Sequence, residues 1–416
     1  MDLRRVDDLP QYVFSRIDKL KAEAAARGAD VIDFGIGSPD VPTPPAVVER
    51  LVGEAREPRN HGYPTSAGLL EVRAALTAWY ARRHGVVLDP ESQTLVTWGA
   101  SEALAHLPWV LLGPGDAALI PEPCYPIHRF AVGFSGAAAL PVRMWGDAFD
   151  LVAEVERAWD TAATKPRVVL VSFPHNPTTR CVEAADFERL VAFARVHDLV
   201  VVHDFAYADI AFDGYRPPSI LQVPGAADVA VELVSLSKSH NMAGWRLGFV
   251  AGSAEVIAGL ARLKSYLDYG VTLAVQRMAL TALEECDDVP ERMAATYETR
   301  RDQLCDGLAA CGWPVARPCG TMFVWARLPP AFRPLGSLAF CELLVRKAGV
   351  AVSPGVGFTA GPDAGRGTWA DEHVRFALVQ PEDRAALALD RIGVVLAAGP
   401  PVEGAPSTSA GRAAFG

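Results

Sequence analysis

A primary amine and two hydroxyl groups come together in the segment SLSK, which ends on Lys238, two residues past the apolar run Val231–Leu236. A lysine amine forms a Schiff base with a carbonyl compound when burial or a neighbouring cation favours its neutral form. Arg246 comes eight positions later, just before the next apolar run, and an arginine there suits a phosphate ester. Taken alone, Lys238 is more typical of a surface lysine, so its neighbours decide the interpretation.

A carboxylate and two further polar groups follow the apolar runs on the amino-terminal side of Lys238. Asp204 closes the run Leu199–His203, where a carboxylate can keep a pyridinium nitrogen protonated and make the ring a better electron sink. The alternative for Asp204 is a helix N-cap. Tyr207 follows three residues later, on the same side of a turn or nascent helix. Asn176 precedes a proline, and its amide either donates to a phenolate oxygen or marks a simple turn.

Three small residues form a candidate phosphate-binding turn. Gly99, Ala100 and Ser101 follow the plausible strand Leu95–Trp98 and precede the helical run Glu102–Leu112. Small residues that open a helix expose backbone N–H groups and a hydroxyl, which together can bind phosphate. A plain helix N-cap would have the same sequence.

The elements that must position these groups alternate along the chain. Amphipathic helical patterns, such as Glu183–Val196 and Glu255–Tyr266, separate short apolar runs typical of strands buried on both faces. The runs are Ala117–Ile120, Val168–Phe173, Leu199–His203, Val231–Leu236 and Leu247–Ala251. This alternation predicts an α/β fold with a mainly parallel sheet. In such a sheet the site lies beyond the carboxyl ends of the strands, where the polar clusters fall.

The rest of the chain predicts a second, smaller unit. Residues 50–290 are predicted to form the large domain, and residues 291–398 a small α+β domain. The latter contains Phe323–Leu328, the helical stretch Phe340–Ala348 and an apolar run that begins at Val374. Residues 1–49 are predicted to be an amino-terminal arm that joins the small domain. Residues 399–416 are rich in Pro, Gly and Ser and are predicted to be a disordered tail.

Composition excludes several classes of protein. The 416 residues are 50% hydrophobic, which supports a sizeable core, and their formal net charge of −10 provides no basic patch for nucleic acid. No stretch is apolar and uncharged for long enough to cross a bilayer, so we expect a cytoplasmic protein without a membrane partner. The seven cysteines are scattered without a C-x-x-C pair, which predicts neither a disulfide framework nor a metal site.

With these residues placed, the segment SLSKSHNMAGWRLGF resembles the lysine motif of the class I/II, fold type I aminotransferases. The resemblance covers roughly Leu9 to Val395. Within that family the chain is most similar to the bacterial alanine (glutamate–pyruvate) aminotransferases, notably in LPQYVFSRI, SFPHNP and VVHDFAYADIAFDG. The resemblance implies a large domain with a mainly parallel seven-stranded sheet, a smaller α+β domain, and pyridoxal 5'-phosphate as cofactor. It also implies ping-pong transfer between an L-amino acid and a 2-oxo acid, with alanine and glutamate, pyruvate and 2-oxoglutarate as the expected pairs.

The family's roles can be carried over to matching positions. Lys238 resembles the lysine that forms the Schiff base with the cofactor and then shuttles the Cα proton. Asp204 matches the partner of the pyridine nitrogen, and His128 resembles the group that supports this aspartate. Asn176 and Tyr207 match the pair that bonds the ring hydroxyl.

The remaining matches concern ring stacking, phosphate and substrate. Tyr125 matches the aromatic residue stacked on the ring, with a core tyrosine as the alternative. The residues that match the family's phosphate site are Gly99, Ala100, Ser101, Ser235, Ser237 and Arg246. Tyr63 resembles the tyrosine that reaches the phosphate of the neighbouring subunit, which implies a homodimer with shared active sites.

Arg375 matches the arginine that binds the substrate α-carboxylate, with an arginine on an exposed strand as the alternative. Gly37 matches a backbone donor to the same carboxylate.

Departures from the family pattern keep other functions open. Close alanine aminotransferases usually carry a lysine where this chain has Ser101, and Thr-Phe-Thr-Pro where it has Val271–Ala274. The second change favours a relative of the same fold that acts on an unusual amino acid, as an aminotransferase, a lyase or a cyclase. A ligand sensor built on the same fold is a further alternative, which the acidic charge and the lack of an amino-terminal helix-turn-helix pattern oppose.

Overall fold

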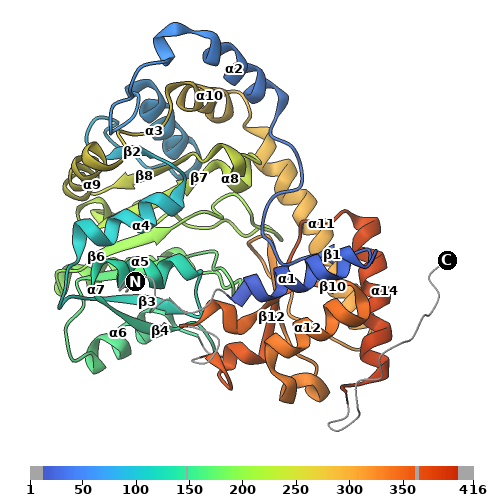
Figure 1. Ribbon diagram of the computed structural model, residues 1–416. Helices are drawn as coiled ribbons and strands as arrows, with labels where there is room; N and C mark the ends of the chain where they lie inside the picture. The colour runs from blue at the N-terminus through green and yellow to red at the C-terminus, as the bar shows by residue number, and fades with distance from the viewer. Residues whose placement is uncertain (1–12, 147–148, 361–364, 402–416) are drawn as a thin grey trace, which may run out of the picture.

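A seven-stranded sheet forms the centre of the larger part of the chain (Figure 1). The computed structural model describes residues 13–146, 149–360 and 365–401. The strand order is β2-β8-β7-β6-β5-β3-β4, and β8 alone runs opposite to the other strands of this sheet. The strands are β2 (Thr94–Thr97), β3 (Ala117–Glu122), β4 (Ala138–Arg143), β5 (Val168–Ser172), β6 (Val200–Asp204), β7 (Ala230–Ser235) and β8 (Gly248–Gly252). The predicted α/β fold with a mainly parallel sheet is confirmed.

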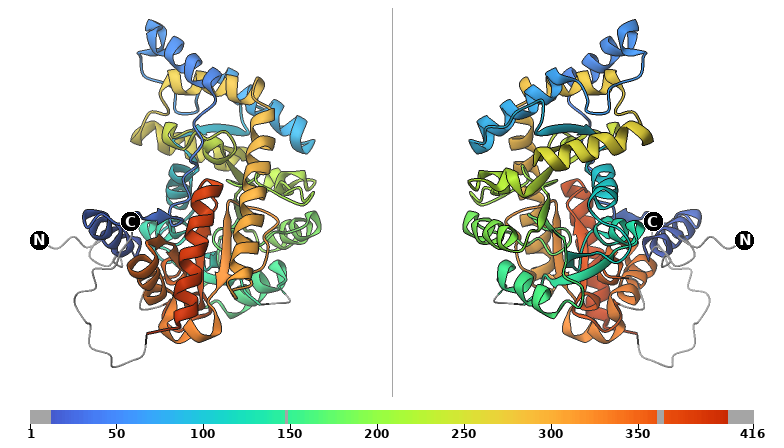
Figure 2. Two further views of the ribbon diagram at one scale, coloured as in Figure 1. Left: turned by 90° about the vertical axis from the view of Figure 1, so that its right-hand side faces the viewer. Right: turned by 90° about the vertical axis from the view of Figure 1, so that its left-hand side faces the viewer.

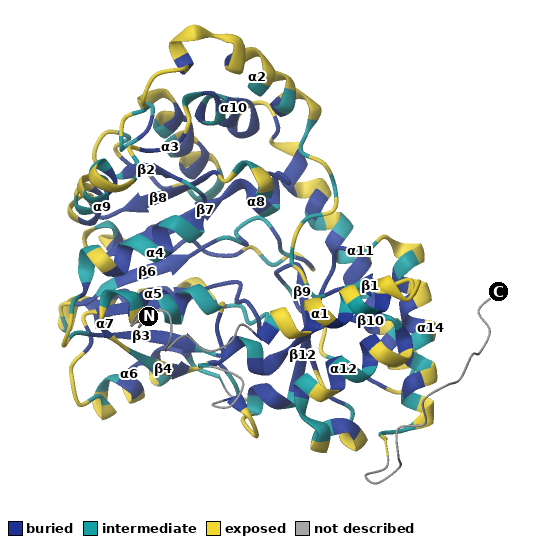
Figure 3. Ribbon diagram, in the orientation of Figure 1, coloured by how far each residue is buried: buried dark blue, intermediate teal, exposed yellow. Residues whose placement is uncertain are grey.

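Helices cover both faces of this sheet, so its central strands are buried on both sides (Figure 3). Successive side chains of a strand point to opposite faces, and on β5 Val169 and Val171 enter one core while Val168 and Leu170 enter the other. The first core includes α3 (Leu70–His84), α6 (Leu151–Thr161), α7 (Ala184–Val196) and α10 (Leu273–Glu284). The second includes α4 (Ala100–Leu111), α5 (Pro126–Ser135) and α9 (Ala254–Leu267). These two cores explain the nearly continuous apolar runs in the sequence.

A second unit packs beside the carboxyl edge of the sheet (Figures 1 and 2). Its antiparallel sheet has the order β11-β12-β9, and β1 pairs with β10 in parallel. Its strands are β1 (Ile32–Asp33), β9 (Phe323–Arg327), β10 (Val350–Ala351), β11 (Ser353–Pro354) and β12 (His373–Ala377). Its helices are α1 (Val13–Ala26), α12 (Gly336–Ala348) and α14 (Glu382–Ala398). Residues from both ends of the chain therefore build this unit.

One of the remaining helices connects the two units. Helix α11 (Asp288–Ala310) contacts α8 (Leu236–Ser239) in the larger part and α14 in the smaller one. Helix α2 (Pro45–Arg56) packs on α10. The 3-10 helices are η1 (Pro58–Asn60), η2 (Ile220–Gln222), η3 (Ala226–Asp228), η4 (Ala243–Trp245), η5 (Pro330–Leu335), η6 (Gly355–Phe358) and η7 (Trp369–Glu372). The predicted domain limits after residues 49 and 290 fall inside α2 and α11, and residues 402–416 of the predicted tail lie outside the described residues.

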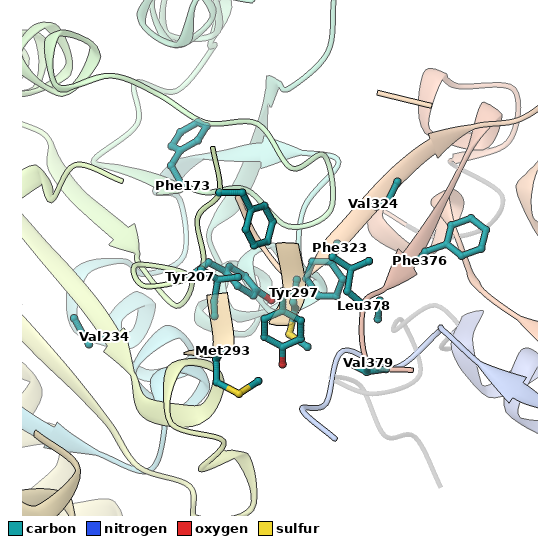
Figure 4. Close-up of a cluster of buried hydrophobic side chains, with 14 of the residues drawn as sticks. Phe173, Tyr207, Val234, Met293, Tyr297, Phe323, Val324, Phe376, Leu378 and Val379 are labelled. Carbon is teal, nitrogen blue, oxygen red and sulfur yellow. The ribbon is translucent and has the colours of Figure 1, made fainter. Parts of the chain in front are cut away.

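An aromatic cluster holds the two units together at the edge where the site lies. Figure 4 shows Tyr207, which follows β6, beside Tyr297 of α11 and Phe323 of β9. The ring centroids of Tyr207 and Phe323 are 5.6 Å apart and meet edge to face, an arrangement that aromatic pairs prefer. This contact fixes the start of β9 against the end of β6.

Within the described residues, no helix is long and apolar enough to span a bilayer. All seven cysteines are free thiols.

Candidate active site

A cavity of about 430 Å³ lies between the carboxyl edge of the seven-stranded sheet and the second unit. Most of the residues singled out from the sequence line it. They are Gly37, Ala100, Ser101, Tyr125, Asn176, Asp204, Tyr207, Ser235, Ser237, Lys238, Arg246 and Arg375. The structure thus brings together residues that are up to 338 positions apart in the sequence, the separation of Gly37 and Arg375.

The reversed direction of β8 brings Arg246 to this cavity. Gly248, the first residue of β8, pairs with both Thr97 at the end of β2 and Ser235 at the end of β7. A strand running the other way would begin at the far edge of the sheet and leave Arg246 there. Backbones also approach closely here, since a Cβ added to Gly248 would lie 2.6 Å from the backbone nitrogen of Ala100.

The turn before α4 has the features of an anion site. Gly99 is the N-cap residue, with φ of 73°, and no side chain caps the helix there. A Cβ on Gly99 would lie 2.7 Å from a guanidinium nitrogen of Arg246, so only glycine lets this cation approach the turn. Free N–H groups at a helix start and an adjacent guanidinium both favour a phosphate.

Lys238 lies in the one-turn helix α8, and its Nζ donates to the carbonyl oxygen of Gly37 over 2.5 Å. Burial, together with the positive charges of Arg375 and Arg246, lowers the pKa of this amine to about 8. Loss of solvation and nearby cations both disfavour the ammonium form. A larger share of the amine is therefore neutral near pH 7 than in an ordinary lysine, and the neutral amine is the nucleophile in Schiff-base formation.

Asp204 ends β6 and is buried, with one carboxylate oxygen 2.8 Å from Nε2 of His128. Its other oxygen accepts from the backbone N–H of Ala206 over 3.3 Å. A turn follows Asp204, so this residue caps no helix and the alternative of a helix N-cap is wrong.

Two tyrosines lie near this carboxylate. Tyr125 precedes α5, and its ring meets that of His128 edge to face. Burial raises the pKa of the Tyr207 phenol, which keeps that hydroxyl protonated.

Arg375 lies in the middle of β12 and is buried, which makes the alternative of an exposed strand arginine wrong. Its guanidinium donates to Oδ1 of Asn176 over 2.7 Å and to the carbonyl of Gly35 over 2.9 Å. The rings of Phe323 and Phe358 lie 4.0 and 4.7 Å from the guanidinium carbon. These contacts fix the plane of the guanidinium, as bidentate binding of a carboxylate requires.

Three residues singled out from the sequence do not line the cavity. Gly99 and His128 lie directly behind it, against Arg246 and Asp204. Tyr63 is 90% exposed, and its ring centroid lies 5.5 Å from that of Tyr269. Its expected contact with a phosphate needs a second chain.

Other residues of the cavity were not among the candidate site residues, although Phe14 and Ile17 lie in the segment LPQYVFSRI that resembles the family. Helix α1 contributes Phe14, Ile17, Asp18 and Lys21. The amine of Lys21 donates to Asp33 over 2.7 Å. Such residues are far from the lysine motif in sequence and belong to no spacing pattern around it. None of Val271–Ala274 lines the cavity of this chain, and Val271 is fully buried, so their effect on specificity stays a prediction.

Comparison with known proteins identifies the family. The model for "Aminotransferase class I and II" matches residues 29–385, which is most of the chain. The chain is a class I and II aminotransferase. It is 46% identical to the glutamate–pyruvate aminotransferase AlaC of Escherichia coli, over 92% of this chain and 91% of that protein. It is 40% identical to an LL-diaminopimelate aminotransferase of Desulforudis audaxviator, over 94% of this chain and 97% of the relative.

Solved structures agree with this assignment. The aminotransferase superimposes on apo-BacF from Bacillus subtilis with a TM-score of 0.86 and 31% identity, over 94% and 97% of the two chains. A probable N-succinyldiaminopimelate aminotransferase from Thermus thermophilus gives a TM-score of 0.83 and 35% identity, over 92% and 100% of the chains. The protein therefore has the fold of these enzymes and uses their cofactor, pyridoxal 5'-phosphate.

Proposed function

We propose that this pyridoxal-phosphate-dependent aminotransferase exchanges amino groups between alanine or glutamate and pyruvate or 2-oxoglutarate. The observation that carries the proposal is the 46% identity to the Escherichia coli glutamate–pyruvate aminotransferase over nearly the whole length of both chains. The relatives named LL-diaminopimelate aminotransferases are 38–41% identical over similar lengths, which makes LL-diaminopimelate the second candidate donor.

The cavity fits the cofactor at several independent points. The uncapped N–H groups at the start of α4 and the guanidinium of Arg246 suit its phosphate. Lys238 supplies an amine with a lowered pKa, which loses its proton easily, for its aldehyde. Asp204, held by His128, suits its pyridine nitrogen. We assign the ring hydroxyl to Tyr207 and the amide nitrogen of Asn176, since the amide oxygen already accepts from Arg375. Tyr125 is assigned to the ring face, and Ser101, Ser235 and Ser237 to the phosphate.

The chain's own groups then perform the binding and proton transfer. When bound, pyridoxal phosphate withdraws electrons from Cα of the amino acid and so weakens the Cα–H bond. Lys238 Nζ would take the proton from Cα and deliver it to the aldehyde carbon of the cofactor, and the second half of the reaction would reverse this transfer. The role suits an amine whose pKa lies near neutral pH. The carboxylate of Asp204 keeps a positive charge on the pyridine nitrogen throughout.

Substrate orientation depends on Arg375. Its fixed guanidinium binds the α-carboxylate in two parallel hydrogen bonds, and the N–H of Gly37 adds a donor. By holding the carboxylate, Arg375 sets the rotation about the substrate's N–Cα bond, so that the hydrogen to be removed from Cα faces Lys238. A 2-oxo acid carries the same carboxylate, and the same grip therefore serves both halves of the reaction.

A homodimer with shared sites completes this proposal. Tyr63 and Tyr269 are 90% and 57% exposed, and their rings lie against each other at an interplanar angle of 37°, away from the cavity of their own chain. Exposed aromatic residues are common in protein interfaces. We assign Tyr63 to the phosphate of the partner subunit's cofactor.

The substrate assignment is tested by mixing the holoenzyme with single amino acids and following the loss of its yellow absorbance by stopped flow. L-alanine and L-glutamate are expected to react with the highest second-order rate constants, with D-alanine as the matched control. Faster reaction with LL-diaminopimelate establishes the second candidate. Reaction with neither group, but with another amino acid, supports the relative of unusual specificity.

A further inference from the structure

A fully buried lysine lies between the turn before α4 and the loop after α9, outside the cavity. Lys264 has no exposed surface, and its Nζ donates to Glu102 Oε2 and to Asp268 Oδ2, each over 3.0 Å. His106 Nδ1 lies 2.6 Å from the other oxygen of Glu102. One ammonium group thus joins α4 to α9.

Each of the two carboxylates also holds a backbone N–H. Oε2 of Glu102 accepts from the N–H of Trp98 over 3.0 Å, so the side chain reaches back across the turn that includes Gly99. Oδ1 of Asp268 accepts from the N–H of Gly270 over 2.8 Å. The same ammonium therefore fixes the turn that approaches Arg246 and the loop that carries Tyr269.

Two simpler explanations fit less well. Ligand atoms of Glu102, His106 and Asp268 lie within 4.8 Å of one another, a spacing that a metal ion could use. The ammonium of Lys264, however, already supplies the positive charge between both carboxylates. A purely stabilising role is also a weak account, because well-packed apolar side chains often stabilise a fold as much as a buried ion pair does. What an apolar pair lacks is the ability to hold the Trp98 N–H and so fix the turn.

We propose that Lys264 and Glu102 are positioning residues for the phosphate of the cofactor. The pair holds the backbone of residues 98–101 so that the N–H groups at the start of α4 and the guanidinium of Arg246 converge on one point. The inference rests on the proposed phosphate-binding role of this turn. It assigns the pair an effect on the phosphate group and none on the rest of the cofactor.

The test compares two ligands that differ only in the phosphate. The full-length chain is stripped of cofactor, and its dissociation constants for pyridoxal 5'-phosphate and for pyridoxal are measured by absorbance titration. In Lys264→Met the constant for pyridoxal phosphate is expected to rise about tenfold or more, the effect of losing one charge-assisted hydrogen bond, while that for pyridoxal changes by less than about threefold. The quantity compared is the ratio of the dissociation constant for pyridoxal phosphate to that for pyridoxal. Glu102→Gln, which keeps the shape of the side chain, is expected to raise this ratio as well, and it carries the test if Lys264→Met does not fold.

Two further variants make the outcomes distinct. Arg301→Met removes another buried cation, which binds Asp213 and the carbonyl of Pro318 away from the cavity, and is expected to leave the ratio unchanged. Arg246→Met tests the phosphate site itself. If Arg246→Met raises the ratio and the Lys264 and Glu102 variants do not, the positioning role is wrong. If Arg246→Met leaves the ratio unchanged, the phosphate assignment fails as well. An equal loss of both ligands in Lys264→Met would show a general structural role and overturn the inference.

Discussion

In the cofactor-free chain, the amine of Lys238 is expected to titrate near pH 8 instead of near its ordinary value of 10.5. Burial is the main cause, and the charges of Arg375 and Arg246 add to it. At pH 7 a pKa of about 8 leaves roughly one tenth of the amine neutral, against roughly 0.03% for an ordinary lysine. The cavity therefore raises the concentration of the reactive form by about 300-fold.

The assay is brief acetylation with acetic anhydride at several pH values, followed by mass spectrometry of the peptide that contains Lys238. Lys165, which is exposed on the surface, reports the reagent's own dependence on pH. Replacing Arg375 by Met is expected to move the midpoint upward, but by less than half of the total shift, because burial is the larger cause. A midpoint above about 10 in the unaltered chain would refute the reasoning, as would an unchanged midpoint in the Arg375 variant.

Three further predictions concern groups around the site. His128→Asn is expected to lower kcat about tenfold with the cofactor still bound, because Asp204 loses its Nε2 partner; an unchanged kcat contradicts this. Tyr63→Phe is expected to weaken pyridoxal phosphate binding about fivefold in a titration, and full affinity argues against a shared site. Glu232→Gln is expected to lower the free energy of unfolding in urea by about 3 kcal/mol at pH 7, since the buried carboxylate accepts from Tyr80 and pairs with His203. Burial alone would raise the pKa of Glu232, but the hydrogen bond and charge of His203, the charge of His84 and the hydrogen bond from Ser219 lower it. Its stabilisation is therefore present above the unfolded pKa, and the difference should shrink as the pH falls below about 4.

Local patterns in the sequence predict the strands that carry the site. The apolar runs that begin at Val168, Leu199 and Val231 are nearly continuous and clearly predict strands buried on both faces. The positions of Asn176, Asp204 and Lys238 at the ends of these strands could therefore be predicted. Strand β4 was missed, because it lies at the edge of the sheet, is only partly buried and contains a proline. The reversed β8 was also not predicted in detail, since direction within a sheet depends on pairing and not on local composition.

Long-range contacts could not be predicted from local patterns. Arg375 was assigned through family resemblance alone, and its bond to Asn176 joins residues 199 positions apart. The contribution of α1 to the cavity depends on how the two units pack, which no spacing in the sequence encodes. Gly37 was expected to matter only through its N–H, but its carbonyl oxygen also accepts from Lys238. This contact, too, depends on how the two units pack.

The most direct test of the central claim is steady-state turnover of Lys238→Ala, with alanine and 2-oxoglutarate as substrates and Lys165→Ala as the matched control. The account predicts that kcat falls by about 10⁴-fold in Lys238→Ala, because no other amine replaces the proton carrier, while Lys165→Ala keeps its full rate. Both variants should show unchanged circular dichroism. A folded Lys238→Ala protein with turnover close to that of the unaltered enzyme would contradict the account.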